Sequence, residues 1–180
     1  MYICAGEIEQ FDFAESVGIG MVDTAVNLTR ICEKKMPDEI IFVGTAGSYG
    51  TVGIFDIVES YRAVTIENSF FNAGAYTPIV SRETSLYFGE NKENSITVNS
   101  SNYITTDTVI AGYYRQEDIT IENMEFFAVL RTAKLLGIPA KGIFIVTNYC
   151  NQTAHEDFLK NHTEAMKTLS QYVSKIKIQL

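Results

Sequence analysis

The sequence of 180 residues contains no tryptophan, only three prolines and two histidines, and no long hydrophobic run. Because no apolar stretch approaches the roughly 20 residues that a transmembrane helix needs, we predict no membrane span. The N-terminus lacks the basic start and apolar stretch of a signal peptide, so we expect a cytoplasmic protein. Basic residues are also scarce, 14 against 22 acidic ones, and the net charge of −8 disfavours nucleic acid and anionic membrane surfaces as partners.

Residues that could bind a metal or form a disulfide are also few. Cys4, Cys32 and Cys150 are odd in number, widely spaced and without a C-x-x-C motif, so we expect buried free thiols, with a reactive Cys150 as the less favoured alternative. His155 and His162 lie seven residues apart with no third ligand, which favours two surface histidines over a metal site. The sequence therefore predicts neither a metal nor another cofactor.

Helical and strand-like patterns alternate along the chain, and the hydrophobic share of 46% suits one domain with a full core. Predicted helices cover 21–35, 123–136 and 154–177. Predicted strands cover 12–17, 39–43, 54–66, 95–98, 119–121 and 141–147, and the aromatic-rich stretch 67–94 is expected to be a packed loop or a partner surface. This order predicts an α/β fold: a single domain over 1–180 with a mixed, mostly parallel sheet flanked by helices.

In such folds ligands bind beyond the carboxyl ends of the strands. The small-residue segment 44–50 follows a predicted strand and is expected to be a turn, in which Thr45 and free backbone N–H groups suit an anion or a ribose. An ordinary strand-end turn is the alternative. Gly18-Ile19-Gly20 opens a predicted helix, and a simple tight turn explains it as well as a ligand site does.

Two further segments carry polar groups at element ends. In Asn123-Met124-Glu125 an ionised, partly buried Glu125 would accept hydrogen bonds from paired sugar hydroxyls; alternatively, Glu122 and Glu125 are only acids in the first turn of a helix. Asn148 ends a buried strand and offers one donor and one acceptor, which is enough to hold a purine edge but not to deliver a proton.

Taken in order, these segments resemble the nucleoside phosphorylase and nucleosidase superfamily. The resemblance rests on the combination of GTAG, N-M-E and GIP followed by a strand, and it runs over most of the chain. The matching stretches are VGIGMVDTAVNLTRICEKKMPDEIIFVGTAGSYG (17–50), VGIFDIVES (52–60), VNSSNYITTD (98–107), ENMEFFAVLRTAKLLGIPAKGIFIVTN (122–148) and the HEDF helix start at His155.

The resemblance implies cleavage of the N-glycosidic bond of a purine nucleoside, by water in a nucleosidase or by phosphate as co-substrate in a phosphorylase. It implies that Met124 and Glu125 hold the ribose, that Tyr103 stacks on the base, and that Thr45 lies beside the nucleophile. Gly20 belongs to the same substrate-binding set. It also implies a homodimer or homohexamer whose neighbours often complete the site.

Three departures from the family pattern weaken the expected chemistry. Asn148 stands where an aspartate usually protonates the purine, so it is expected only to hydrogen-bond the base. Phe42 stands where hexameric phosphorylases have a phosphate-binding arginine. The start of the chain looks like the family's second strand, so the domain is expected to be N-terminally short and to lack the nucleophile site. Glu7 and Glu9 are the nearest acids that could supply it, but solvent-facing strand or turn residues are the favoured interpretation.

Three hypotheses therefore remain open. The first is an active or specialised purine nucleoside phosphorylase or nucleosidase. The second is a degenerate relative that binds a nucleoside or base, or serves as an assembly subunit. The third is an unrelated α/β binding protein.

Overall fold

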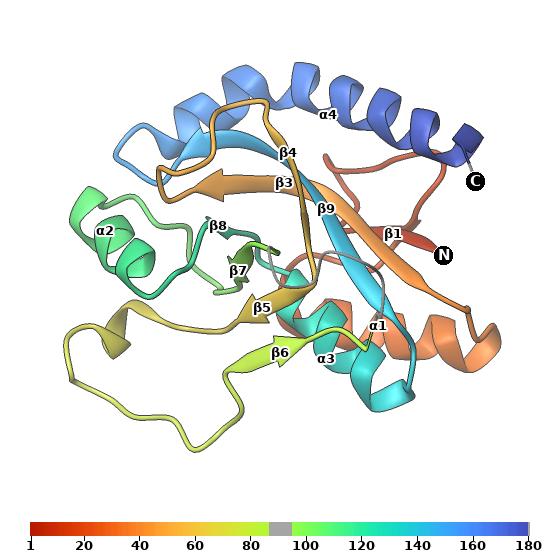
Figure 1. Ribbon diagram of the computed structural model, residues 1–180, viewed down its shortest axis with the longest axis horizontal. Coiled ribbons are helices and arrows are strands. Elements are labelled where there is room, and N and C mark those ends of the chain that lie inside the picture. Colours follow the sequence, from red (N-terminus) through yellow and green to blue (C-terminus); the bar gives the residue numbers. More distant parts are fainter. Residues whose placement is uncertain (87–94, 180) are drawn as a thin grey trace.

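Two long parallel strands form the centre of the computed structural model, which describes residues 1–86 and 95–179. They are β3 (Ile40–Ser48) and β9 (Ala140–Tyr149), paired along their whole length. Figure 1 shows them side by side in the middle of the molecule. Their continuous β-branched runs are typical of strands covered on both faces, and every residue of β3 is buried.

Shorter strands extend this pair into a nine-stranded sheet. They are β1 (Tyr2–Cys4), β2 (Glu15–Ser16), β4 (Ile57–Ser60), β5 (Arg62–Val64), β6 (Arg82–Thr84), β7 (Thr97–Asn99) and β8 (Ile121–Glu122). Five of the eight strand pairings are parallel, which confirms the prediction of a mixed, mostly parallel sheet.

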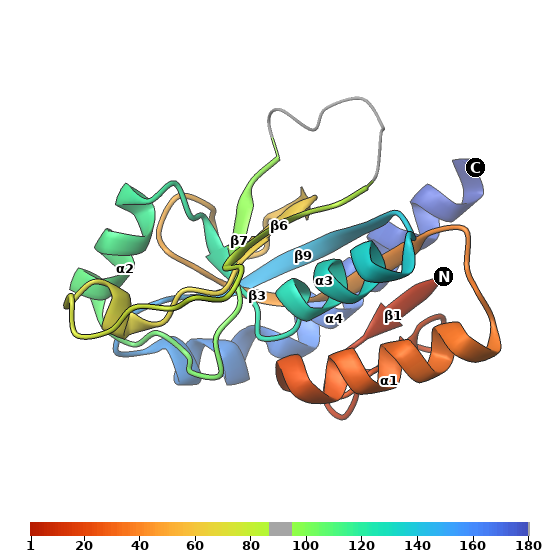
Figure 2. The same cartoon turned by 90° about the horizontal axis from the view of Figure 1, so that it is seen from below.

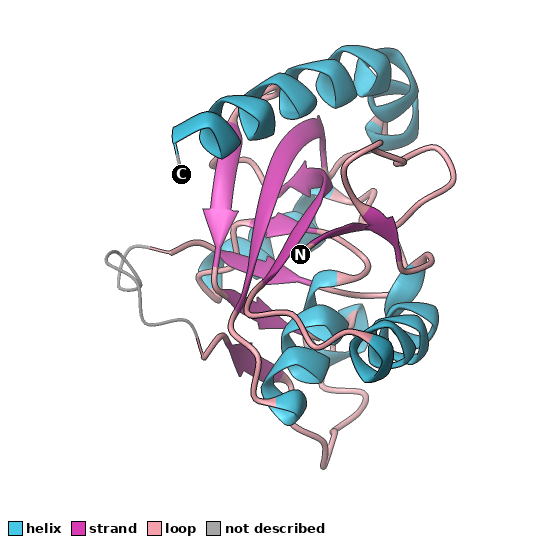
Figure 3. Cartoon of the chain, turned by 90° about the vertical axis from the view of Figure 1, so that its right-hand side faces the viewer, coloured by secondary structure: helices cyan, strands magenta, loops and turns pink. Residues whose placement is uncertain are grey.

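Helices cover both faces of the sheet. The helix α4 (Ala154–Gln179) packs across β9 and β3 on one face, as Figure 1 shows at the top. On the other face α1 (Gly20–Lys34) packs against α3 (Phe126–Leu136), and Figure 2 shows the two together in front of the sheet. Figure 3 shows the resulting layers, with helices above and below the strands. The short helix α2 (Thr108–Gln116) lies apart at one end.

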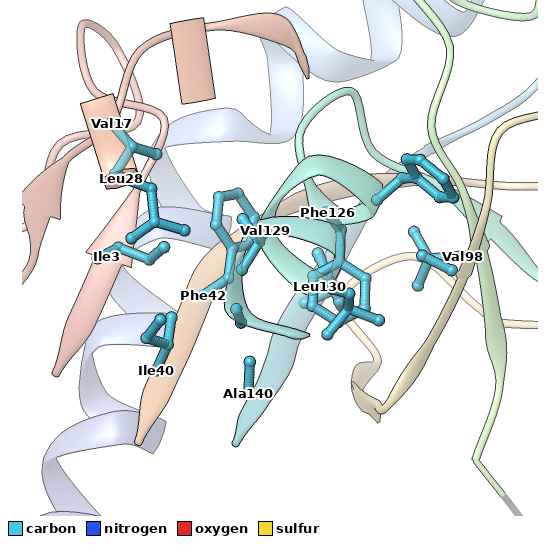
Figure 4. Close-up of a cluster of buried hydrophobic side chains, with 14 of the residues drawn as sticks. Ile3, Val17, Leu28, Ile40, Phe42, Val98, Phe126, Val129, Leu130 and Ala140 are labelled. Carbon is cyan, nitrogen blue, oxygen red and sulfur yellow. The ribbon is translucent and has the colours of Figure 1, made fainter. Parts of the chain in front are cut away.

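The larger hydrophobic core lies between the sheet and the α1–α3 pair. Figure 4 shows its side chains converging from β1, β3, β9 and both helices. Phe42 lies inside this core, with its ring 5.8 Å from that of Phe144 and 6.3 Å from that of Phe126. A second cluster joins the opposite face of the sheet to α4. All three cysteines are buried and free, as predicted.

The structure corrects several predicted boundaries. The segment 44–50 is not a turn over most of its length, because β3 continues to Ser48 and keeps its pairing with β9. The predicted strand 54–66 is divided into β4 and β5, and the predicted strand 12–17 shrinks to β2. The prediction missed α2, whose N-terminus is capped by the Asp107 carboxylate accepting from the N–H groups of Val109 and Ile110.

The stretch 67–94 contains a 3-10 turn at Asn68–Phe70 and the edge strand β6. Phe71 packs on Tyr114, with ring centroids 4.8 Å apart, whereas Phe70, Tyr76, Ile79 and Val80 are exposed. Tyr87 and Phe88, part of the predicted aromatic surface, lie outside the described residues. Within the part of the chain that is described, no helix is long and apolar enough to cross a membrane.

Candidate active site

A cavity of about 270 Å³ opens where the turn after β1 meets the C-terminal part of β3, the loop after β7, the β8–α3 connection and the start of α4. It is close in size to the smaller ligand pockets of proteins. Its walls are formed by Ala5, Gly6, Ile8, Glu9, Ile19, Thr45, Ala46, Gly47, Ser101, Tyr103, Ile104, Glu122, Asn123, Met124, Glu125, Thr147, Asn148, Ala154, His155 and Phe158.

Five of the six site residues expected from the sequence lie on this wall. They are Thr45, Tyr103, Met124, Glu125 and Asn148. Gly20 is behind the wall, where its backbone N–H donates to Glu125 Oε1 at 2.8 Å. The structure therefore brings together residues that are separated by about a hundred positions in the chain.

Glu125 lies at the entrance to α3 and is only 4% exposed. The Asn123 side chain fixes this entrance, because its Oδ1 accepts from the N–H groups of Glu125 and Phe126 and its Nδ2 donates to the Thr45 carbonyl at 3.2 Å. Burial raises the pKa of Glu125 to about 7, the bond from Gly20 N–H acts in the opposite direction, and the nearby charge of Glu9 raises the pKa further. Glu125 can thus exchange a proton near neutral pH.

Glu9 was expected to face solvent, and this expectation is wrong. Its Oε1 accepts a hydrogen bond from the Thr45 hydroxyl, and its Oε2 accepts from the Thr45 backbone N–H at 3.1 Å. The turn after β1 thus carries a carboxylate to the cavity that already holds Glu125. The sequence signal was an acid three residues after a glycine that follows a strand, Gly6-Glu7-Ile8-Glu9, at the carboxyl end where ligands bind.

Gly44 explains how Glu9 comes so close to β3. A Cβ atom at position 44 would lie 3.1 Å from Glu9 Oε2 and 3.0 Å from the Phe42 ring, so a side chain there would displace one of them. The Thr45 N–H, expected to be free for an anion, is already bonded to Glu9. The glycines of the GTAG segment therefore leave room for carboxylate side chains to pack against β3. They do not form a turn that binds an anion.

Asn148 lies at a bulge in the β3–β9 pairing. Ala46 pairs with Val146 and Gly47 with Asn148, so Thr147 is the extra residue. The buried Asn148 amide accepts from the Thr147 hydroxyl at 2.9 Å and donates to the Tyr149 carbonyl at 3.2 Å. Each amide group has further capacity, so Asn148 can still bond a ligand in the cavity.

The mouth of the cavity is apolar. Tyr103 is 74% exposed there, and Ile8, Ile19 and Ile104 are exposed beside it. Phe158 of α4 lies on the wall, and its ring is 5.1 Å from that of His162. His155 is exposed at the mouth, in agreement with a surface position. Phe158 was missed because α4 was interpreted only as a covering helix.

Charge is distributed unevenly in the cavity. Glu9, Glu122 and Glu125 line it, whereas no lysine or arginine among the described residues does. Phe42, which the family resemblance aligns with an arginine, lies in the core and is not part of the cavity wall. The described residues contain no cluster of three or more His, Cys, Asp or Glu suited to a metal ion. Cys150 is buried and its raised pKa disfavours a reactive thiolate.

Several solved structures share this fold. The 5′-methylthioadenosine/S-adenosylhomocysteine nucleosidase of Helicobacter pylori with butyl-thio-DADMe-Immucillin-A has a TM-score of 0.80 at 13% identity, covering 99% of this chain and 97% of that one. The corresponding nucleosidase of Neisseria meningitidis with methylthio-immucillin-A has a TM-score of 0.78 at 18% identity, covering 99% and 98%. The futalosine hydrolase of Helicobacter pylori strain 26695 has a TM-score of 0.79 at 13% identity, covering 99% and 97%.

At these identities the likeness establishes the fold. No curated protein matches the sequence. The family model described as the phosphorylase superfamily matches residues 3–177, which is nearly the whole chain, and its match agrees with the resemblance of the GTAG and N-M-E segments. The protein is therefore a member of the phosphorylase superfamily.

Proposed function

We propose that the protein hydrolyses the N-glycosidic bond of a nucleoside, with water as the nucleophile. The observation that carries this proposal is the charge of the cavity: three carboxylates and, among the described residues, no lysine or arginine. A phosphate dianion placed beside Glu9 and Glu125 would be repelled and would lack a cationic partner. Water carries no charge and is activated by a carboxylate that accepts its proton.

Glu125 is assigned to the ribose. Its buried carboxylate accepts from the Gly20 N–H, has further lone pairs to offer, and belongs to a residue that lines the cavity. An ionised carboxylate accepts hydrogen bonds from two neighbouring sugar hydroxyls, and its negative charge favours the oxocarbenium-like transition state that forms as the bond to the base breaks. Met124 lies beside it on the wall and supplies apolar contact.

Glu9 is assigned to the water molecule. The Thr45 hydroxyl and N–H fix its carboxylate on the same wall as Glu125. In the proposed step, the water oxygen bonds to C1′ while the C1′–N bond breaks, and the electron pair of the C1′–N bond passes to the base. Glu9 takes one proton from the water and later releases it to solvent, and the departing base takes one proton from solvent, so that the products are the free sugar and the neutral base.

Tyr103 and Asn148 are assigned to the base, for which a purine is the proposed class. The exposed Tyr103 ring provides a face on which a base can stack. Asn148 can donate through its amide to a ring nitrogen or a carbonyl of the departing base. The hydrogen bond stabilises the charge on the leaving group without transferring a proton.

A second candidate function is binding without turnover. It is favoured by Asn148, because an amide in place of a carboxylic acid removes a proton donor that is worth roughly 10²–10⁴-fold in rate. The held carboxylates of Glu9 and Glu125 favour hydrolysis instead, so turnover is the proposal and binding alone is the alternative.

We further propose a homo-oligomer, with a homodimer as the simplest form, rather than a free monomer. Ile19, Val22 and Val26 are exposed along one side of α1, and Tyr103 and Ile104 are exposed at the nearby mouth. Exposed apolar patches of this kind are typical of protein interfaces. A second copy seated there would narrow the mouth and exclude solvent from the reacting bond. Sedimentation of the pure protein measures this state directly.

The experiment follows base release from inosine, adenosine and methylthioadenosine, each with and without phosphate. We expect release from at least one nucleoside at a rate that phosphate leaves unchanged, together with the corresponding free sugar, detected as a reducing sugar. Release that requires phosphate and yields a sugar phosphate would show phosphorolysis instead. Nucleoside binding by calorimetry without release would show the binding-only function.

A further inference from the structure

A second cavity, of about 150 Å³, lies beyond the carboxyl ends of the two central strands, next to α2. β3 ends at Ser48 and β9 at Tyr149, and both residues line it. In Figure 1 the arrowhead of β3 points toward α2. The second cavity shares no wall residue with the cavity that contains Glu9 and Glu125. Because this edge of an α/β sheet is where ligands bind, the second cavity is a candidate binding site in its own right.

The charge of this cavity is opposite to that of the first. Arg115, in the last turn of α2, lines it, whereas no Asp or Glu of the described chain does. The protein has 22 acidic residues and only 14 basic ones, so acidic partners are not scarce. An arginine that lines a cavity without an acid beside it therefore points to an anionic ligand.

Arg115 has no anionic partner in the described part of the chain. It takes part in none of the ion pairs found there, and Glu117, two residues further on, pairs with Arg82 instead. Its guanidinium also makes no hydrogen bond to the described residues. All five N–H donors of the planar group are thus available, and their arrangement matches the oxygens of a phosphate or a carboxylate.

Two glycines show where the guanidinium lies. A Cβ atom on Gly50, which has a φ of +110°, would lie 2.7 Å from Arg115 Nη1. A Cβ atom on Gly112 would lie 3.7 Å from Nη2. One end of the group therefore lies against the segment that follows β3, and the other end lies beside α2. Because Gly50 itself lines the cavity, Nη1 is at the cavity wall.

Ser48 adds a buried donor at the end of β3. The residue is 0% exposed, and its Oγ accepts from the N–H groups of Gly50 at 3.0 Å and Val52 at 3.3 Å. Ser48 and Gly50 both line the second cavity, so this hydroxyl lies beside it. Its lone pairs are used, and its hydrogen has no acceptor among the residues that the structure describes. A buried donor of this kind calls for a partner.

Two more donors come from other elements. The Thr108 hydroxyl lines the cavity from the first turn of α2, and Asn151 lines it from the segment after β9. Asn151 Oδ1 accepts from the N–H and the hydroxyl of Thr153, at 2.9 and 2.8 Å, which leaves its Nδ2 to donate to a ligand. Donors from α2, β3 and the segment after β9 suit a tetrahedral anion better than a planar carboxylate.

We propose that the second cavity binds a phosphate group, either as inorganic phosphate or as the phosphate of a small sugar ester. Arg115 supplies the charge and the paired N–H donors, and Ser48 and Asn151 supply further hydrogen bonds. The volume is below the roughly 300 Å³ of the smaller ligand pockets, so a whole nucleoside does not fit. Phosphate bound there is not the nucleophile of the proposed hydrolysis, because Glu9 and Glu125 line the other cavity.

The test is calorimetric titration of the whole protein at low ionic strength. Inorganic phosphate, ribose 5-phosphate and acetate are added separately. We expect saturable binding of one phosphate per chain, at least about tenfold tighter than that of acetate, because a dianion makes more charge-assisted hydrogen bonds. Equal affinity for phosphate and ribose 5-phosphate would show that the site recognises the phosphate group alone. Tighter binding of the ester would show a site for a phosphorylated sugar.

Variants at Arg115 locate the binding in the second cavity. Arg115→Gln should weaken phosphate binding at least about tenfold, because the charged donors are lost. Arg115→Lys keeps the charge but loses the planar fork, so its affinity should lie between those of wild type and Arg115→Gln. Arg30→Gln removes the same charge from an exposed position on α1 and should bind phosphate as wild type does. Without phosphate, all three variants should keep the wild-type melting temperature.

No saturable binding of phosphate by wild type would overturn the inference, as would an affinity that Arg115→Gln leaves unchanged. Equal losses in Arg115→Gln and Arg30→Gln would also overturn it, because only the net charge would then matter. Acetate binding as tight as that of phosphate would remove the phosphate group as the ligand class. Binding is measured without turnover, so the outcome is independent of whether the protein hydrolyses nucleosides.

Discussion

The two ends of the cavity hold their carboxylates in different ways. At the ribose end, backbone N–H groups of Gly20 and Thr45 bond Glu125 and Glu9 directly, so the main chain of α1 and β3 sets their positions. At the base end, Glu122 is held by a side chain, the Tyr49 hydroxyl, and by the N–H of Thr105 in a loop. Main-chain donors survive substitution, whereas side-chain donors do not.

This difference separates the two tasks of the proposed enzyme. The ribose is the same in every nucleoside, and rigid elements hold the groups assigned to it. The base differs between substrates, and the groups assigned to it are side chains and a loop that mutation can change without disturbing the sheet. The comparison predicts that ribose-end variants lose rate for all substrates, and that base-end variants lose affinity or selectivity.

The largest effect is expected for Glu125→Gln. The amide keeps the size of the side chain but loses the charge that favours the transition state, so kcat/KM should fall roughly a thousandfold for every nucleoside cleaved. Steady-state assays of base release measure this loss. Glu33→Gln, an exposed acid on α1, is the control and should be unchanged. A loss below tenfold would remove Glu125 from the ribose.

Glu9→Gln should have the next largest effect. The amide cannot take a proton from water, so kcat should fall about a hundredfold while KM stays within about twofold. Glu7→Gln, two residues away and exposed, should behave as wild type. If KM rose instead and kcat were retained, Glu9 would hold the substrate rather than the water, and both carboxylates of the ribose end would serve binding.

The raised pKa of Glu125 predicts a pH-dependent stability. The folded state has a pKa of about 7 and the unfolded chain a pKa of 4.5, so between these values the folded protein binds more protons. Stability is therefore full at low pH and falls as pH rises through this window, by roughly 3 kcal/mol from Glu125. Glu125→Gln should be the more stable protein at pH 8, with the difference vanishing near pH 4. Denaturant unfolding at both pH values measures it; a constant difference would contradict the burial of this charge.

Tyr103→Ala should have the smallest effect. Removing the stacking surface should raise KM about tenfold, with kcat nearly unchanged, since base–aromatic stacking is worth roughly 1–3 kcal/mol. Tyr103→Phe keeps the ring and should retain wild-type KM. Because the side chain is 74% exposed, neither variant should alter the melting temperature. A fall in kcat without a change in KM would place Tyr103 at the reacting bond. The ribose end and the base end of the cavity would then no longer have separate tasks.

Much of the fold was accessible from the sequence because the central strands leave a strong signal. The runs EIIFV and KGIFIVT predict β3 and β9, and helical spacing predicts α1, α3 and α4. The N-M-E and V-T-N segments lie at the ends of such elements, so their residues were found. The prediction for 44–50 was wrong because its glycines suggested a turn. Pairing with β9, about a hundred residues away in the chain, keeps most of that segment extended.

The contacts of Glu9 and the burial of Glu122 were missed for the same physical reason. An acid in a short turn is usually solvated, and only the missing side chain of Gly44, brought near by the β1–β3 pairing, lets Glu9 reach Thr45. Glu122 is buried and accepts from the Tyr49 hydroxyl, which comes from the end of another strand. Such contacts depend on tertiary packing and leave no periodic trace in the sequence.

The pairing of β3 with β9 also has a consequence for how the chain is synthesised. The ribosome releases Glu9 and β3 early, but Asn148 and Phe158, which close the same cavity, come more than a hundred residues later. During synthesis the apolar edge of β3 therefore stays unpaired until β9 has been made. This delay slows folding and leaves an aggregation-prone strand exposed. A ligand that bridges the two halves of the cavity would stabilise the finished protein and would give no help to the growing one.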